Sequence, residues 1–299
     1  MRFRLLYLSI VLHCLVFKLS AQPGTVVFQS DFGVKDGAVS AMKGVASGVS
    51  GNLRLFDLTH DIPAYNIWEA AYRLEQTATY WPAGTVFVSV VDPGVGTQRR
   101  SVVLKTRSGH YIVTPDNGTL TFVSQSLGID AVREIDEAVN RRKGSEASYT
   151  FHGRDVYAYT AARLAAGQIT FEQVGKLAPA EVVNISYQKA ALKGKVIYGN
   201  IPILDIQYGN IWTNIDAALF NSLHIKPGNK LVVSISHKHK KVFEQAMPFV
   251  ETFGAVATGK ILAYQNSLMN LSFAINMGNF SEKYKVSSGN DWSVTVSKK

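Results

Sequence analysis

Val91-Asp92-Pro93-Gly94-Val95-Gly96-Thr97-Gln98-Arg99-Arg100 continues directly from an apolar, β-branched run at residues 85–91. Such a run is typical of a fully buried strand. The stretch then supplies a carboxylate, a Pro-Gly turn and two arginines where that strand would end. In open α/β sheets, ligands bind at the carboxyl ends of the strands. The same residues could also form a structural turn that Asp92 caps, with solvated arginines, so the local sequence leaves both interpretations open.

Strand-like and helix-like segments alternate along residues 24–180. Apolar and β-branched runs predict strands at 26–28, 53–57, 85–91, 101–104 and 111–113. Helices are expected at 38–45, 67–80, near 120–123 and at 156–166. Asp155 is expected to cap the last of these helices and Gly167 to end it. Because such alternation favours parallel strands, the sequence predicts an N-terminal α/β domain with a largely parallel sheet at residues 22–185.

Short β-prone runs at close spacing dominate the chain after Gly194. Gly, Pro and Asn separate these runs, and no long amphipathic helix is evident. Strands are expected at 195–198, 211–215, 231–236, 261–264, 271–275 and 293–296. This pattern predicts a separate C-terminal domain at residues 190–299, largely antiparallel and similar to a small β-barrel. The connection between the domains is expected near residues 181–194.

The N-terminus has the pattern of a secretory signal peptide at residues 1–21. Arg2 and Arg4 precede an apolar run at residues 5–17, and small residues follow at positions 20 and 21. The run is shorter than the roughly 20 apolar residues that a membrane-spanning helix needs. We therefore expect cleavage, export to the periplasm or the medium, and no stable membrane anchor. A retained anchor is the alternative interpretation.

The chain is basic, but its charge does not indicate a nucleic-acid partner. The formal net charge is +9, and removal of Arg2, Arg4 and Lys18 with the signal peptide lowers it to +6. The only dense cluster of basic residues is at 237–241, between two strand-like segments. It lacks the interleaved aromatic side chains on which bases would stack. A solvated hairpin tip is the better interpretation of this cluster.

Six short motifs follow one another in an order that resembles a known family. They resemble the S-adenosyl-L-methionine hydroxide adenosyltransferases, which are related to fluorinating and chlorinating enzymes that act on the same molecule. The resemblance spans about residues 25–280. Any one motif would be weak, but the ordered set is specific. The motifs are Ser30-Asp31-Phe32-Gly33, Asp57-Leu58-Thr59-His60, the stretch at 91–100, Pro115-Asp116-Asn117-Gly118, Phe151-His152-Gly153-Arg154-Asp155 and Tyr208-Gly209-Asn210-Ile211-Trp212-Thr213-Asn214.

The resemblance implies an enzyme that splits S-adenosyl-L-methionine with water into adenosine and L-methionine. It implies an α/β N-terminal domain, a β-barrel-like C-terminal domain and a homotrimer. The active site would lie between the N-terminal domain of one subunit and the C-terminal domain of its neighbour. The small-molecule substrate would be S-adenosyl-L-methionine itself, and no metal or redox cofactor is implied.

The resemblance also implies roles for individual residues. Asp92, Arg99 and His152 would bind and activate the attacking water. Asp31 would accept hydrogen bonds from the two ribose hydroxyls, as a carboxylate can. Asp205, Asn210 and Ser267 would hold the amino and carboxylate ends of methionine, and Tyr208 and Trp212 would face the adenine. Without the resemblance, Asp31 could simply cap the helix that begins near Gly37, and His60 is expected to be structural.

Two positions favour water over a halide as the nucleophile. The halogenating relatives carry tyrosine where this chain has Asp92 and serine where it has Gly153. A carboxylate at position 92 would repel a halide in a desolvated site. One departure concerns Leu268-Met269-Asn270, which replaces an arginine-containing stretch of the halogenating relatives. The competing hypotheses are an exported nucleoside-binding protein without catalysis and a halogenase.

Overall fold

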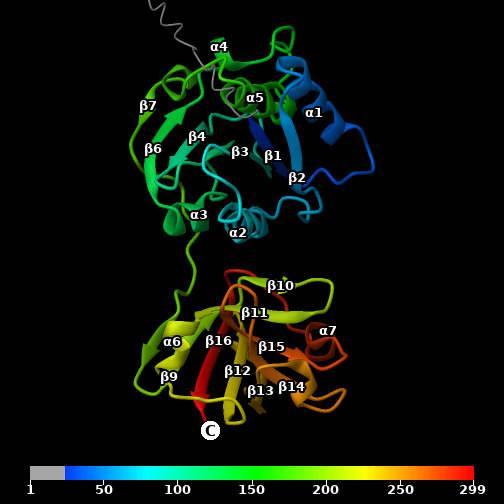
Figure 1. Cartoon of the computed structure of the whole chain (residues 1–299), viewed down its shortest axis with the longest axis vertical. Coiled ribbons are helices and arrows are strands. Elements are labelled where there is room, and N and C mark those ends of the chain that lie inside the picture. The colour runs from blue at the N-terminus through cyan, green and yellow to red at the C-terminus, as the bar shows by residue number, and fades with distance from the viewer. Residues whose placement is uncertain (1–23) are drawn as a thin grey trace, which may run out of the picture.

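The computed structural model describes residues 24–299, which form an α/β part and a β-rich part joined by one connection (Figure 1). The α/β part contains one seven-stranded sheet, and the β-rich part contains two antiparallel sheets. The predicted signal peptide at residues 1–21 lies outside the described residues. Among the helices of residues 24–299, none is long and apolar enough to cross a membrane.

The seven strands of the N-terminal sheet have the order β2-β1-β3-β5-β4-β6-β7. The four neighbours β2, β1, β3 and β5 pair in parallel, whereas β4 and β7 run in the opposite direction to the others. The predicted, largely parallel sheet is therefore confirmed. The strands are β1 (Thr25–Ser30), β2 (Arg54–Thr59), β3 (Val86–Val90), β4 (Ser101–Thr106), β5 (Tyr111–Pro115), β6 (Ile129–Glu134) and β7 (Leu177–Ala178).

Helices cover both faces of this sheet, because alternate side chains of a strand point to opposite faces. Val26 and Phe28 of β1 pack with α1 and α5, whereas Val27 packs on the other face with α2. The helical elements of this part are α1 (Ala38–Val49), α2 (Ile67–Ala78), α3 (Thr121–Ser126), α4 (Glu137–Asn140), the π-helical segment η1 (Gly153–Ala158), α5 (Tyr159–Ala165) and the 3-10 turn η2 (Phe171–Val174).

The order of the strands leaves a crevice beside the end of β1. From β1 the chain passes through α1 to β2 on one side, and then returns through α2 to β3 on the other side of β1. The loops that follow β1 and β2 therefore lead to helices on opposite faces of the sheet, α1 on one and α2 on the other. Ligands of open α/β sheets bind at such a switch point, outside the carboxyl ends of the strands.

Two antiparallel sheets pack face to face in the C-terminal part. Their core lies between residues such as Ile197, Val233 and Val294 of one sheet and Ile211 and Phe273 of the other. The first sheet has the order β13-β12-β16-β9-β8 and the second β10-β11-β15-β14. The strands of the two sheets are β8 (Ala191–Lys193), β9 (Val196–Asn200), β10 (Ile203–Asp205), β11 (Asn210–Asp216), β12 (Lys230–His237), β13 (Lys240–Pro248), β14 (Ile261–Gln265), β15 (Asn270–Ile275) and β16 (Trp292–Lys298). The C-terminal part also has short helical elements, α6 (Ala217–Asn221), η3 (Phe253–Ala255) and α7 (Phe280–Tyr284).

The C-terminal part is antiparallel, as predicted, but within residues 24–299 its two sheets do not join into a closed barrel. Just after the end of β13, an isolated bridge joins Phe249 to Ala263 of β14. The antiparallel strands themselves are confirmed, as is the hairpin tip at 237–241. Lys238 and His239, with φ of 47° and 66°, form its two-residue turn between the paired His237 and Lys240.

Side chains of helix α2 contact the C-terminal part. The indole Nε1 of Trp68 donates to the carbonyl of Pro202 at 2.7 Å, and Arg73 donates to the carbonyl of Leu204 at 3.2 Å. The segment that precedes the C-terminal part packs against the N-terminal part. Val182 is buried in the core of the N-terminal part, and the backbone N–H of Val183 donates to Asp116.

The helix predicted at 156–166 differs from its expected form at its start. It begins as the π-helical segment η1, and His152, not Asp155, occupies its N-cap position. Asp155 is buried within η1, where it forms ion pairs with Arg142 and Arg154. The expectation that Asp155 caps the helix was therefore wrong, because its carboxylate is engaged by two arginines instead of by backbone N–H groups.

Candidate active site

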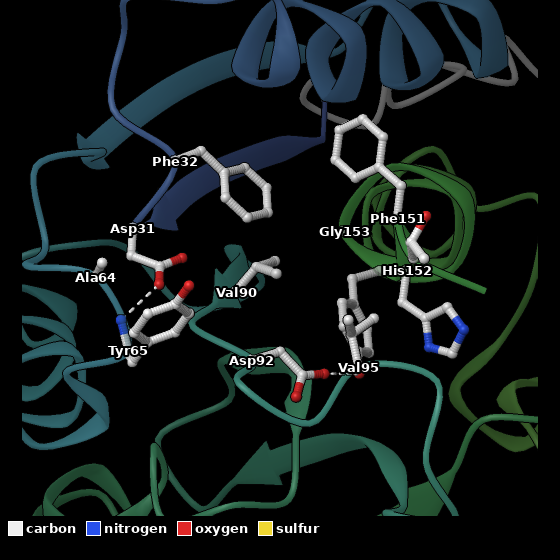
Figure 2. Close-up of a pocket in the computed structure, with 12 residues that line it drawn as sticks. Asp31, Phe32, Ala64, Tyr65, Val90, Asp92, Val95, Phe151, His152 and Gly153 are labelled. Carbon is white, nitrogen blue, oxygen red and sulfur yellow. Dashed lines mark hydrogen bonds between the residues drawn. The ribbon is translucent and has the colours of Figure 1, made fainter. Parts of the chain in front are cut away.

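A cavity of about 250 Å³ lies at the carboxyl ends of β1, β2 and β3, beside the start of η1 (Figure 2). Asp31 and Phe32 follow β1, Tyr65 follows β2, and Asp92 follows β3. His152 enters the cavity from the start of η1. This is the crevice that the strand order creates, so the fold explains why residues far apart in sequence meet here.

Asp92 is held by the turn that follows it. Its Oδ1 accepts a hydrogen bond from the backbone N–H of Gly94 at 3.2 Å and forms an ion pair with the guanidinium of Arg99. A Cβ on Gly94 would overlap that guanidinium. The carboxylate therefore caps the turn and faces the cavity, whereas the expectation of solvated arginines was wrong, because Arg99 pairs with Asp92 and Arg100 with Asp116. Arg99 stands behind Asp92 and is not among the residues that line the cavity.

Tyr157 of η1 approaches the second oxygen of Asp92. Its hydroxyl lies 3.4 Å from Oδ2 of Asp92 and 3.1 Å from Oγ of Ser101. Burial raises the pKa of Tyr157 well above its usual value, and the charge of Asp92 raises it further. The phenol therefore stays protonated and donates to Asp92. Asp92 thus accepts hydrogen bonds at both carboxylate oxygens in a nearly buried position, with its side chain 6% exposed.

His152 is buried on the opposite side of the cavity from Asp31. Burial lowers the pKa of His152 below 6.5; the charge of Glu137 opposes this shift, and the charge of Arg141 adds to it. The imidazole is therefore neutral at pH 7. Its Nε2 lies 3.0 Å from Nη2 of Arg141. Figure 2 shows one ring nitrogen on the side of Asp92 and the other turned away from the cavity.

Asp31 occupies the turn after β1 and keeps hydrogen-bonding capacity for a ligand. Its Oδ2 accepts the backbone N–H of Tyr65 at 2.9 Å, and an ionised carboxylate has further acceptor sites. It does not cap α1, because the N-cap residue is Gly37 without a side-chain cap. Behind it, Oγ of Ser30 lies 2.7 Å from Nδ1 of His60, whose Nε2 lies 2.9 Å from Asp57. These bonds brace the ends of β1 and β2, which agrees with the structural role expected for His60.

The five predicted residues of the C-terminal part line a second cavity of about 850 Å³. Nδ2 of Asn210 donates to Oδ2 of Asp205 at 3.1 Å, and Tyr208 stands at the rim, 65% exposed. Within the described part of the chain, Trp212 Nε1 is a buried donor with no hydrogen-bond partner. The residues that meet in this cavity are Asp205, Tyr208, Asn210, Trp212 and Ser267.

The structure thus gathers the nine predicted residues in two places. Asp31, Asp92 and His152 line the first cavity with Arg99 behind them, and the other five line the second. The two cavities share no lining residue. In residues 24–299 no group of three or more His, Cys, Asp or Glu side chains has the geometry to hold a metal ion.

Four residues of the first site were not expected from the sequence. Tyr65 contacts Asp31, Tyr157 contacts Asp92, and Arg141 with its partner Glu137 contacts His152. No local pattern marks them, because each depends on a contact between distant segments. The motif at 115–118 is structural: Asp116 pairs with Arg100, and Nδ2 of Asn117 donates to the carbonyl of Val91 at 2.8 Å.

The chain resembles known proteins over most of its length. A protein of Methanocaldococcus jannaschii named (R)-S-adenosyl-L-methionine hydrolase is 32% identical over 83% of this chain and 92% of its own length. A fluorinase of Actinopolyspora mzabensis is 28% identical over 91% of this chain and 97% of its own. The crystal structure of an uncharacterized conserved protein from Thermotoga maritima, 32% identical, matches 91% of this chain and all of that chain with a TM-score of 0.82.

Two family models match the two parts of the chain in turn. The model of the SAM hydroxide adenosyltransferase N-terminal domain matches residues 26–175. The model of the corresponding C-terminal domain matches residues 199–293. Together they cover all residues that line the first cavity and all residues that line the second. The chain belongs to the SAM hydroxide adenosyltransferase family.

Proposed function

We propose that this protein hydrolyses S-adenosyl-L-methionine to adenosine and L-methionine. The observation that carries the proposal is the carboxylate of Asp92, which is ion-paired with Arg99 and faces the same small cavity as the neutral His152. A water molecule in that cavity meets a proton acceptor and polar groups that hold it. The relative of Methanocaldococcus jannaschii that is named a hydrolase supports the same reaction.

The reaction needs a nucleophile more than it needs an acid. The ribose C5′ of the substrate carries a sulfonium, which leaves as a neutral thioether without protonation. Free water is a poor nucleophile, with a pKa of about 15.7. As the C5′–O bond forms, the C5′–S bond breaks, its electron pair stays on sulfur, and the water proton passes to a base of the site. Holding the water in line with the C–S bond lowers the barrier by orientation.

Asp31 and the second cavity supply binding groups for the two ends of the substrate. The acceptor sites of Asp31 suit the ribose diol. In the second cavity, Asp205, Asn210 and Ser267 suit the amino and carboxylate groups of methionine, and Tyr208 and Trp212 offer flat apolar area to the adenine. We propose that a complete site joins the first cavity of one subunit to the second cavity of its neighbour in a homotrimer. That arrangement accounts for two separate sets of ligand-binding side chains in one chain.

The test of the activity is direct. The protein without residues 1–21 is incubated with S-adenosyl-L-methionine, and adenosine and methionine are measured by chromatography. The wild type is expected to release both in equal amounts, and Asp92→Ala is expected to release neither. Asp130→Ala is the matched control, because this aspartate pairs with Lys105 on the surface, 48% exposed. Turnover by Asp92→Ala equal to that of wild type would exclude Asp92 from the chemistry.

The same experiment separates the two alternatives. A nucleoside-binding protein would bind adenosine saturably and form no product from S-adenosyl-L-methionine. A halogenase would convert the substrate to a 5′-halogenated adenosine when fluoride or chloride is added. Close packing at Gly153 speaks against the halide, since a Cβ there would lie 3.2 Å from the ring of Phe32 and 3.3 Å from the sulfur of Met42. The serine of the halogenating relatives would have to displace one of them.

We also propose that the protein is exported, on the strength of the pattern at residues 1–21. The expected mature N-terminus is Gln22. N-terminal sequencing of the protein recovered outside the cytoplasm of producing cells tests this. A chain that still begins at Met1 and remains inside the cells would contradict export.

A further inference from the structure

Arg141 is a buried arginine whose guanidinium contacts the imidazole of His152. Its side chain is 7% exposed. Nη2 lies 3.0 Å from Nε2 of His152, Nη1 donates to the carbonyl of Ser148 at 3.1 Å, and Nε donates to Oε2 of Glu137 at 3.1 Å. Glu137 lies one helical turn earlier, in α4, and forms an ion pair with the guanidinium. Three fixed partners therefore define where this guanidinium points.

The chemistry of a guanidinium fixes the role of the nitrogen that it contacts. Arginine has five N–H donors and no acceptor, and it does not lose its proton in proteins. Nε2 of His152 must therefore accept the hydrogen bond with a lone pair. A neutral imidazole that accepts at one nitrogen carries its proton on the other. The proton of His152 then lies on Nδ1. In Figure 2 one ring nitrogen of His152 lies toward Asp92, as this arrangement requires of Nδ1.

We propose that Arg141 is a positioning residue that holds His152 neutral with its proton on Nδ1, so that His152 donates a hydrogen bond to the attacking water instead of taking its proton. This inference rests on the proposed hydrolysis. His152 and Asp92, on two sides of the cavity, then have different roles. His152 orients the water oxygen through Nδ1–H, and the water proton passes to the carboxylate of Asp92 as the C5′–O bond forms.

The charged groups around His152 agree with a neutral ring. Glu137 and Arg141 face it from the α4 side, Asp92 from the turn after β3, and Asp155 from η1. Glu137 is paired with Arg141, Asp92 with Arg99, and Asp155 with two arginines. The rings of Tyr149 and Tyr157 lie nearby, with centroids 6.4 and 6.3 Å away. The three carboxylates raise the pKa of His152, but each is paired with an arginine, and burial of the ring outweighs them.

The protonated nitrogen can be measured without reference to activity. Histidine labelled with ¹⁵N is incorporated into the protein, and the two ring nitrogens of His152 are identified by their absence from the spectrum of His152→Gln. We expect Nδ1 to be protonated and Nε2 to be bare at pH 7 and above. A wild-type spectrum with the proton on Nε2, or with both nitrogens protonated at pH 7, would overturn the proposal even if no variant of Arg141 folds.

Two variants test whether Arg141 is the cause. Arg141→Met removes the donor and the cation but keeps an unbranched side chain. In this variant we expect His152 to lose its preference for Nδ1–H and its NMR-monitored pKa to rise by about one unit, because a neighbouring cation is gone and Glu137 is left unpaired. Arg142→Met is the matched control, since Arg142 pairs with Asp155, which keeps Arg154. An unchanged tautomer and pKa in Arg141→Met would leave Arg141 a merely structural role.

Kinetics separate a donor from a base at position 152. The side-chain amide of asparagine can place an N–H near the position of Nδ1–H but cannot accept a proton. We expect His152→Asn to retain at least tenfold more kcat than His152→Ala. Equal losses of kcat in the two variants would show that His152 acts as the base. If wild type shows no hydrolysis although Nδ1 is protonated as expected, the proposed function fails while the hold of Arg141 on His152 stands.

Discussion

Arg99 reaches back across the turn after β3 to pair with Asp92, and its guanidinium occupies the space that a side chain on Gly94 would fill. The turn is therefore shaped around the ion pair. Asp92 also accepts the backbone N–H of Gly94, which fixes the carboxylate at the end of a buried strand. A carboxylate held in this way needs little reorganisation when a proton arrives, which is the arrangement that general-base catalysis favours.

Gly94→Ala is expected to damage activity more than stability. The added methyl overlaps the guanidinium of Arg99, which is 21% exposed and can swing toward solvent. We expect kcat/KM to fall by about tenfold or more, because small misplacements of catalytic groups are costly, and the free energy of unfolding to change by less than about 1 kcal/mol. Gly44→Ala in α1, where a Cβ meets nothing within 4 Å, is the control. Equal kcat/KM in Gly94→Ala and wild type would contradict the coupling of turn and ion pair.

Asp92→Asn is expected to lower kcat by about 10²- to 10⁴-fold, the usual contribution of a positioned base. The amide keeps the shape of the side chain and its contact with Gly94 but cannot take the water proton. KM should change little, because Asp31 and the second cavity carry the proposed binding groups. Initial rates of adenosine release over a range of substrate concentrations measure both constants. A variant that retains a third of the wild-type kcat would exclude Asp92 as the acceptor.

The strands that frame the site were predictable because burial leaves a strong pattern in them. The run at 85–91 is buried throughout, and β1 is buried along its whole length. Strand β6 was not predicted, and β13 was expected only as a strand-like segment after the hairpin tip, without bounds. Each exposes part of one face, and β13 carries charged and polar residues such as Lys241, Glu244 and Gln245 that weaken an apolar run. Packing against neighbouring strands, not their own composition, makes these segments strands.

The chemistry of the site was only half predictable for a similar reason. The motif residues Asp31, Asp92 and His152 do meet in one cavity. Their partners Arg141 and Tyr157 could not be identified, because neither lies in a motif and each meets its partner only in the folded chain, Arg141 at His152 and Tyr157 at Asp92. Asp155 was predicted as a helix cap from its position alone. The rule for helix caps considers only backbone N–H groups as partners of the capping side chain, so it could not indicate the ion pairs of Asp155 with Arg142 and Arg154.

Stability is expected to fall in mild acid because of His152. Burial lowers the pKa of His152 below its unfolded value of 6.5, whereas in the unfolded chain the imidazole takes up a proton near pH 6.5. The unfolded state therefore binds more protons over this range, and the free energy of unfolding decreases as the pH drops from about 6.5 toward the folded pKa. Urea denaturation at pH 7 and pH 5 measures the loss. His152→Gln should lose less than wild type; an equal loss would contradict a lowered pKa.

Asp155 is expected to be a structural anchor of the site. Burial raises its pKa, but hydrogen bonds from Arg154 and Arg142 outweigh burial and hold the pKa below 3.8. We expect Asp155→Asn to cost about 2 kcal/mol, less than the 3–5 kcal/mol typical of a broken buried pair, because both arginines reach solvent. Chemical denaturation at pH 7 measures this. Asp130→Asn, an exposed partner of Lys105, should change stability by less than about 1 kcal/mol. The stabilising effect of Asp155 in the wild type should vanish as the pH falls through the folded pKa of Asp155.

The separation of the two cavities leads to a prediction about mixed assemblies. Asp92→Ala damages the first cavity, and Asn210→Ala damages the second, so each variant alone should be nearly inactive below the wild-type KM. If each site joins the first cavity of one subunit to the second cavity of the next, a mixed ring contains some sites in which both halves are intact. Random assembly of equal amounts of the two chains makes about one site in four of this kind in a cyclic trimer. Co-expression of the two variants should therefore restore about a quarter of the wild-type rate. Activity no greater than the average of the separate variants would show that each chain completes its own site.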